Sequence, residues 1–219
     1  MAMSLAAVVA AKVVTSVALS SARMVSGRTT TGTRRVDRSS ASQAYAWLFE
    51  GPDVVFTDPD SGATVSIGSA CNAAMLTPEK FDYVINCCPS DITVNHPCVR
   101  TLDLADTDDV SLAPVRAELE RISFEVASMF RARGDADAHA PRILCHCWMG
   151  ASRSVAVAIY LLCMVYGPLT KEGTPLAEFH RWYADFKTRR PCINVSVRLM
   201  HEVCRLLENA RRPLEAARR

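Results

Sequence analysis

The fold of this chain is decided at residues 146–154, which read HCWMGASRS. Residues 142–145, RILC, are typical of a short buried strand, and residues 155–165, VAVAIYLLCMV, are typical of an apolar helix that ends at Gly167 and Pro168. The segment between them is therefore a turn from a strand into a helix. At such a turn the free backbone N–H groups and the positive end of the helix dipole form an anion site that fits one phosphate.

Several side chains of this segment suit chemistry at phosphorus. Positive backbone dipoles and a guanidinium lower the pKa of a thiol to about 3.5 to 7.5, so we expect Cys147 to be a thiolate nucleophile. Arg153 provides a planar fork of donors for two phosphate oxygens, and Gly150 allows a tight turn. Ser154 is expected either to cap the helix or, more usefully, to donate a hydrogen bond to the sulfur. His146 is expected to make an orienting hydrogen bond that fixes the loop geometry.

The segment resembles the signature of the cysteine-dependent protein phosphatases, and its Ser-Arg-Ser ending is similar to that of the dual-specificity branch. The resemblance covers roughly residues 45–210. Residues 64–69 and 73–74 resemble the first core strand of the branch and the helix after it, residues 81–87 its next buried strand, and residues 189–194 the segment before its last helix. The resemblance implies a dual-specificity phosphatase-like α/β fold.

The same resemblance implies a metal-free protein phosphatase, without a cofactor, that removes phosphate from phosphotyrosine and phosphoserine or phosphothreonine in phosphoprotein substrates. Cys147 would attack phosphorus and form a phosphocysteine intermediate. An upstream aspartic acid would protonate the leaving oxygen and then activate water, and Ser154 would stabilise the departing thiolate. The phosphate-binding residues would be Trp148, Met149, Gly150, Ala151, Ser152 and Arg153. Dual specificity is expected because the chain is too short for the loops that deepen the pocket of the Tyr-only relatives.

The general acid is expected among the nearby aspartates Asp103, Asp106, Asp108 and Asp109. Leu102 and Leu104 alternate as a short strand, which places Asp103 on the opposite face. Residues 106–112 resemble the acid loop of the family when Asp106 takes the place of the acid, whereas Asp108 would need a shift along the chain. We therefore expect Asp106 to be the acid, with Asp108 as the alternative.

A second cysteine near the nucleophile is a candidate for redox control. In some relatives a cysteine at the C-terminal end of the neighbouring core strand forms a reversible disulfide with the nucleophile. Cys88 matches that place in residues 84–88, VINCC, and Cys87 is the alternative. A thiol there would trap a sulfenic acid before irreversible oxidation, but both cysteines can also be ordinary buried thiols.

The rest of the chain alternates strand and helix signals, which predicts a mainly parallel central sheet flanked by helices on both faces. Apolar residues recur at helical spacing in two stripes: Leu112, Val115, Leu119, Ile122, Val126 and Met129, then Phe179, Trp182, Tyr183 and Phe186. Thr174 followed by Pro175 predicts the start of the second of these helices. A last amphipathic helix is expected over residues 197–207.

The composition of the 219 residues limits the class of protein. A hydrophobic content of 49% is ample for one domain, and a net charge of +2 gives no electrostatic footprint for nucleic acid or an acidic membrane. No uninterrupted apolar run is long enough to span a membrane. The nine cysteines are odd in number and lack metal-binding spacing, which indicates free thiols in a reducing compartment and no metal site.

We expect three segments: a basic, Ala/Ser/Thr-rich N-terminal tail at residues 1–44, a catalytic domain at 45–211 and a C-terminal tail at 212–219. The first 36 residues contain no acidic side chain and resemble a mitochondrial presequence, and a disordered low-complexity tail is the other interpretation. We expect a cytoplasmic protein, with a mitochondrial location as the alternative.

Two other functions compete with protein dephosphorylation. The first is a phosphoinositide or RNA 5′-phosphatase on the same scaffold. Lysines in the loop would suit polyphosphorylated lipid headgroups, and residues 147–153 contain none, which lowers the lipid case. The second is a phosphosite-binding scaffold protein, which would be expected to have lost its nucleophile, and Cys147 is present. Hydrolysis of an aryl phosphate separates an enzyme from a scaffold.

Overall fold

The computed structural model of the chain describes residues 51–74, 78–89, 94–105, 111–131, 139–167 and 173–216, with side chains up to residue 210. The expected N-terminal tail at 1–44 lies outside the described residues. So do the acid candidates Asp106, Asp108 and Asp109.

The described strands form one sheet in the order β1-β2-β5-β3-β4. They are β1 (Asp53–Thr57), β2 (Thr64–Ser69), β3 (Tyr83–Asn86), β4 (Val99–Thr101) and β5 (Arg142–Cys147). β1 pairs with β2 in antiparallel fashion, whereas β2, β5, β3 and β4 pair in parallel. The predicted mainly parallel sheet is confirmed, with an antiparallel edge strand that the sequence did not indicate.

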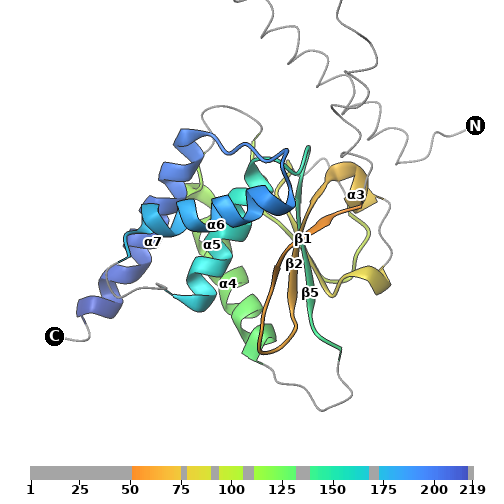
Figure 1. Ribbon diagram of the computed structural model, residues 1–219, viewed down its shortest axis with the longest axis horizontal. Coiled ribbons are helices and arrows are strands. Elements are labelled where there is room, and N and C mark those ends of the chain that lie inside the picture. The colour runs from red at the N-terminus through yellow and green to blue at the C-terminus, as the bar shows by residue number, and fades with distance from the viewer. Residues whose placement is uncertain are drawn as a thin grey trace, which may run out of the picture.

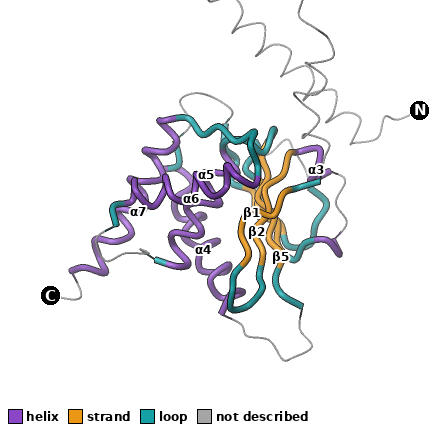
Figure 2. Tube along the Cα trace, viewed as in Figure 1, coloured by secondary structure: helices purple, strands orange, loops and turns teal. Residues whose placement is uncertain are grey.

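Helices cover both faces of the sheet, as the sequence predicts (Figure 1). One face carries α4 (Arg116–Arg131), α5 (Arg153–Tyr166), α6 (Pro175–Arg189) and α7 (Val197–Ala216), and the other carries the short α3 (Ala70–Ala74). Two single turns, η2 (Pro78–Lys80) and η3 (Ala113–Val115), precede β3 and α4. Figure 2 shows the same two layers of helix around the strands. α7 runs past the expected end of the last helix and into the segment 212–219 that was expected to be a tail.

Two helix ends lie where the sequence signals place them. The Thr174 hydroxyl accepts a hydrogen bond from Ala177 N at 3.2 Å, so it caps α6 as expected, with Pro175 in the first turn. Gly167 follows α5 with φ at +67°, a conformation that favours glycine. The residues of α5 from Arg153 to Cys163 are all buried, because this helix is packed between the sheet and the other helices.

The prediction of a short strand at Leu102 and Leu104 is wrong, because β4 ends at Thr101. Leu102 N still donates to Asn86 O at 2.9 Å, but Asp103 then adopts a φ of 48° and turns the chain out of the extended conformation. The expected alternation of burial nevertheless holds, since both leucines are buried and Asp103 is exposed.

The C-terminal ends of the parallel strands meet at one edge of the sheet. β2, β5 and β3 therefore bring Ser69, Cys147 and the residues after Asn86 together at that edge. The loop from Cys147 to Arg153 lies at the same edge, between the end of β5 and the start of α5. This is the position in which an open α/β sheet builds a ligand site.

Candidate active site

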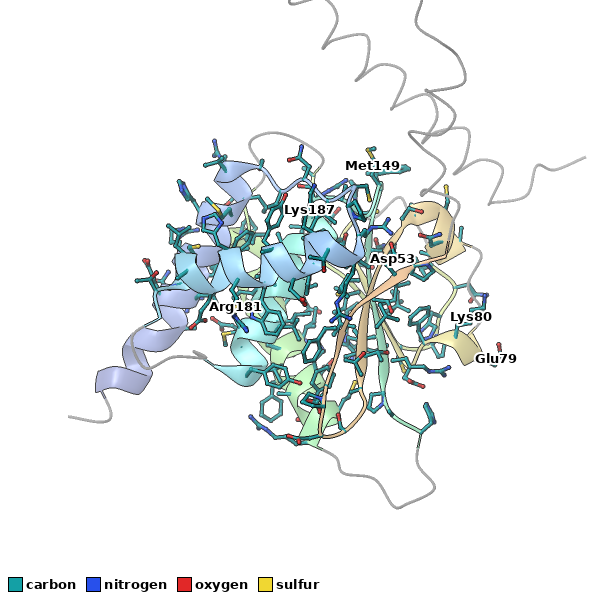
Figure 3. All side chains as sticks on the ribbon, in the orientation of Figure 1. Asp53, Glu79, Lys80, Met149, Arg181 and Lys187 are labelled. Carbon is teal, nitrogen blue, oxygen red and sulfur yellow. The ribbon has the colours of Figure 1, made fainter. Side chains whose placement is uncertain are left out.

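The 147–153 loop buries the side chains of its nucleophile and its arginine, and its other side chains lie at the rim. Cys147 and Arg153 are 2% and 3% exposed, whereas Trp148, Met149, Ala151 and Ser152 are half-buried. Met149 points out beyond the end of the sheet (Figure 3). α5 starts at Arg153 and aims its N-terminus at the loop, so the positive end of a helix dipole lies beneath it. The arrangement suits an anion bound at Cys147.

The backbone of the loop is oriented by hydrogen bonds from outside it. Trp148 O accepts from Ala70 N at 3.1 Å, Gly150 O from Arg190 Nε at 2.9 Å and Ala151 O from Asn194 N at 2.8 Å. In a trans peptide the N–H of the next residue points opposite to the carbonyl. Because these carbonyls point outward, the N–H groups of Met149, Ala151 and Ser152 point toward the inside of the loop. They form the donor set of an oxyanion site.

The thiol of Cys147 is held in an environment that favours its ionised form. Ser154 Oγ donates a hydrogen bond to Cys147 Sγ at 3.3 Å, which is the more useful of the two roles considered for this serine. Burial disfavours the thiolate, but the Arg153 charge and hydrogen bonds from Ser154 and Ser152 outweigh it, so the pKa of the Cys147 thiol lies below its ordinary value. By contrast, burial and the nearby Cys147 raise the pKa of Cys145 to about 12. Of these two neighbouring thiols, only Cys147 is activated as a nucleophile.

A close approach of two backbones fixes the tight turn at Gly150. Gly150 has a φ of +64°, and a Cβ at this position would lie 2.5 Å from Gly68 O. Gly68 itself has little room, because a Cβ there would lie 3.2 Å from the side chains of Asn72, Leu144 and Pro52. The sequence singled out Gly150, but it gave Gly68 no role beyond the strand. A glycine inside a strand is the signal that could have found it.

Arg153 also connects the loop to the segment before the expected general acid. Its Nη1 donates to Leu104 O at 2.7 Å, so Leu104 lies beside the 147–153 loop. On the far side of the undescribed residues 106–110, Glu202 accepts hydrogen bonds from Ser111 Oγ at 2.9 Å and Leu112 N at 3.1 Å. The described chain therefore leaves the loop after Leu104 and resumes at Ser111, which is hydrogen-bonded to α7. The choice between Asp106 and Asp108 stays a prediction.

His146 does not make the orienting hydrogen bond expected from the sequence. Its side chain is fully buried, and neither ring nitrogen has a partner in the described part of the chain. The alternation along β5 turns the ring to the face that carries Leu144, away from Cys147. Burial and the Arg153 charge lower the pKa of His146 to about 3, so the ring is neutral. The contribution of this residue to the described site is its backbone carbonyl, which accepts from Cys87 N at 2.8 Å.

The structure favours Cys87 as the neighbour of the nucleophile. β3 pairs with β5 through Ile85 with Cys145 and Asn86 with His146, so the next step along both strands brings Cys87 beside Cys147. Burial, together with the thiols of Cys145, Cys147 and Cys88, raises the pKa of Cys87 well above its ordinary value. Cys88 is also buried, and its N–H donates to Asn86 Oδ1 at 2.9 Å. No cysteine of the chain is in a disulfide.

Arg190, Asp53 and Asn194 contribute to the site without having been identified from the sequence. Arg190 and Asn194 lie in the segment 189–194, for which the sequence indicated only a resemblance to the segment before the last helix of the dual-specificity branch. Both residues donate hydrogen bonds to carbonyls of the loop. Arg190 also forms an ion pair with Asp53. A pair of arginines at the end of a helix usually lies in solvent, so only the three-dimensional contacts reveal the role of Arg190.

Neither a metal centre nor a membrane span is found in the described ranges. Within them, no group of three or more His, Cys, Asp and Glu side chains could hold a metal ion. Of the helices that the structure describes, none is long and apolar enough to cross a membrane.

Solved structures share this architecture. No protein-family model matches the sequence, and no curated protein matches it. A variant of human DUSP28 aligns over 74% of this chain and 98% of its own, with a TM-score of 0.53 and 17% identity. The Yvh1 phosphatase domain from Chaetomium thermophilum aligns over 73% of this chain and 96% of its own, with a TM-score of 0.51 and 18% identity. A putative mouse dual-specificity phosphatase, crystallised with zinc tungstate, aligns over 84% and 97% of the two chains, with a TM-score of 0.50 and 16% identity. The chain therefore has the fold of the dual-specificity phosphatases.

Proposed function

We propose that this protein is a cysteine-dependent phosphatase that hydrolyses phosphotyrosine and phosphoserine or phosphothreonine in protein substrates. One observation carries the proposal: a thiol with a lowered pKa lies at the base of a loop whose N–H groups point inward, beside a buried arginine. An oxyanion with three equatorial oxygens matches this donor set. The fold shared with phosphatase domains is consistent with it.

The proposed reaction has two steps. The Cys147 thiolate attacks phosphorus while the bond to the leaving oxygen breaks, and Asp106 gives its proton to that oxygen. The loop amides and Arg153 hold the equatorial oxygens throughout. Water then attacks the phosphocysteine, its proton passes to the Asp106 carboxylate, and the sulfur–phosphorus bond breaks to release inorganic phosphate. Ser154 donates to the departing thiolate, for which its 3.3 Å contact with the sulfur is already in place.

Dephosphorylation of proteins is preferred over that of inositol lipids because of the rim of the loop. Its half-buried side chains, Trp148, Met149, Ala151 and Ser152, carry no charge. A polyphosphorylated headgroup would require several cations close to the bound phosphate. A neutral rim instead suits a single phosphate on a peptide chain. We also propose that the protein works in a reducing compartment, the cytoplasm or the mitochondrion, because a thiolate nucleophile requires a reduced cysteine.

An aryl phosphate assay tests the activity. Wild-type protein, reduced and folded, should hydrolyse p-nitrophenyl phosphate, tungstate should inhibit it, and Cys147→Ser should abolish turnover. Cys98→Ser is the matched control, because Cys98 is an exposed thiol away from the loop. Matched phosphotyrosine and phosphothreonine peptides, measured beside phosphoinositides, then define the substrate. No hydrolysis by folded wild-type protein would refute the proposed activity, and turnover of the lipids alone would refute the proposed substrate class.

A further inference from the structure

Arg190 is the largest side chain buried almost completely in the described structure, with 1% exposure. It follows the last residue of α6, and its backbone N–H still donates to Phe186 O at 2.8 Å. A buried guanidinium is costly unless it is paired and hydrogen-bonded. The contacts that compensate this burial therefore indicate what the side chain does.

Two of those contacts join parts of the chain that are far apart in sequence. Nε donates to Gly150 O at 2.9 Å, and Nη1 forms an ion pair with Asp53. Asp53 is the first residue of β1, and Figure 3 shows it beside the end of α6 near the strands. Its side chain is 42% exposed, so a carboxylate at the surface is joined to a guanidinium in the interior.

We propose that Asp53 and Arg190 form a clamp that positions the 147–153 loop for phosphate binding. The clamp acts through Gly150: while Arg190 holds the carbonyl outward, the N–H of Ala151 points inward to the anion. Asp53 acts one step further away, because it orients the guanidinium that holds the carbonyl. Both are positioning residues, since neither contacts the sulfur, and the clamp rests on the proposed phosphatase function only for its effect on turnover.

The geometry requires an arginine at position 190. Its planar guanidinium directs Nε to one partner and Nη1 to another, and a lysine, with a single ammonium, cannot reproduce this fork. The turn also brings Arg190 close to the backbone, since a Cβ on Gly150 would lie 2.9 Å from Nη2. Displacing the guanidinium would therefore release the loop at Gly150, where its backbone lies closest to the backbone of Gly68.

Arg190→Lys and Asp53→Asn test the clamp, with Asp185→Asn as the matched control. Asp185 forms an exposed pair with Arg189 at 3.7 Å, next to Arg190 in sequence, and such surface pairs contribute little. Two readouts are measured on the full chain: inhibition by inorganic phosphate, and the pH midpoint of Cys147 alkylation by iodoacetamide, followed by mass spectrometry. The second needs no catalysis, so it judges the clamp even if the proposed activity fails.

We expect Arg190→Lys to weaken phosphate inhibition by about ten- to a hundredfold, and Asp53→Asn by about tenfold. The reason is that a displacement of about 1 Å in the groups of a site can cost up to about a hundredfold. The alkylation midpoint should rise in both variants, and the Asp185→Asn control should match wild type. For Asp53→Asn, the direction in which the alkylation midpoint moves separates two explanations. Loss of a negative charge would lower the midpoint if only the electrostatic effect on Cys147 mattered, whereas loosening of the loop raises it.

Folded Asp53→Asn with an unchanged or lower midpoint and unchanged phosphate inhibition would overturn the clamp. A lower melting temperature with both readouts unchanged would show a purely structural ion pair, which also overturns it. If Arg190→Lys does not fold, Asp53→Asn still decides, since its carboxylate is partly exposed. A wild-type protein that phosphate does not inhibit would refute the proposed function instead, and the alkylation midpoints would still judge the clamp.

Discussion

Gly150→Ala should separate the geometry of the loop from the stability of the fold. A Cβ at position 150 would lie 2.5 Å from Gly68 O, and ordinary contact begins at 3.4 Å, so the loop and β2 must move apart by about 0.9 Å. Both atoms nearest to the Cβ belong to the backbone of Gly68, so no side chain can rotate away. A displacement of about 1 Å at a reacting group costs about a hundredfold in rate. We therefore expect kcat/KM on an aryl phosphate to fall by about a hundredfold.

The same substitution has a conformational cost, because alanine at a φ of +64° costs about 1–2 kcal/mol. Gly167→Ala is the control for a glycine at positive φ: its φ is +67° and its ψ is −168°, and no described atom beyond its chain neighbours lies within 4 Å of the added Cβ. Both variants should lose at least about 2–8 °C in melting temperature. Only Gly150→Ala should lose activity, as measured by steady-state kinetics on folded protein. A Gly150→Ala enzyme with the kcat/KM of Gly167→Ala would refute the close approach of loop and strand.

Three further predictions concern the chemistry of the site. Asp106→Ala should lower kcat by about a hundred- to ten-thousandfold and remove one limb of the pH–rate profile, while Asp108→Ala stays near wild type; the reverse result would move the acid to Asp108. Mild peroxide should join Cys87 to Cys147 in a disulfide visible by mass mapping, and dithiothreitol should restore activity in wild type; equal recovery in Cys87→Ser would exclude this partner. Ser154→Ala should slow phosphocysteine hydrolysis and shift the acidic limb of the kcat/KM profile to higher pH, because the hydroxyl that lowers the pKa of the Cys147 thiol is gone. An unshifted limb would show that this hydrogen bond does not stabilise the thiolate.

The sequence predicted local features of the site because they depend on near neighbours. The turn from β5 into α5, the Thr174 cap and the contact of Ser154 with Cys147 each join residues a few positions apart. Periodicity and cap chemistry are informative at this range. The mainly parallel sheet followed from the alternation of strand and helix signals, which is local information as well.

What the sequence did not reveal depends on contacts between distant segments. Gly68 is needed because another backbone approaches it, and Arg190 is buried because it lies between Gly150 and Asp53. A glycine inside a strand can signal a close approach but does not identify the approaching segment, and the residues beside Arg190 do not indicate its burial. The expectation for His146 failed for a related reason: a ring beside the nucleophile in sequence was expected to act in the loop, but the two-residue period of β5 turns it to the other face.

The buried position of His146 makes the fold sensitive to mild acid. In the unfolded chain the imidazole takes up a proton near its ordinary pKa of 6.5, whereas in the folded protein burial and Arg153 hold its pKa at about 3. The unfolded state therefore binds the extra proton first, and the free energy of unfolding should fall by about 1.4 kcal/mol for each pH unit below about 6.5, until the folded form also protonates near about 3. Above about 6.5 the ring is neutral in both states and has no such effect. His146 begins to destabilise the fold at a higher pH than the one at which carboxylates titrate. The protein should therefore begin to lose stability at pH values where most globular domains remain near their maximum stability.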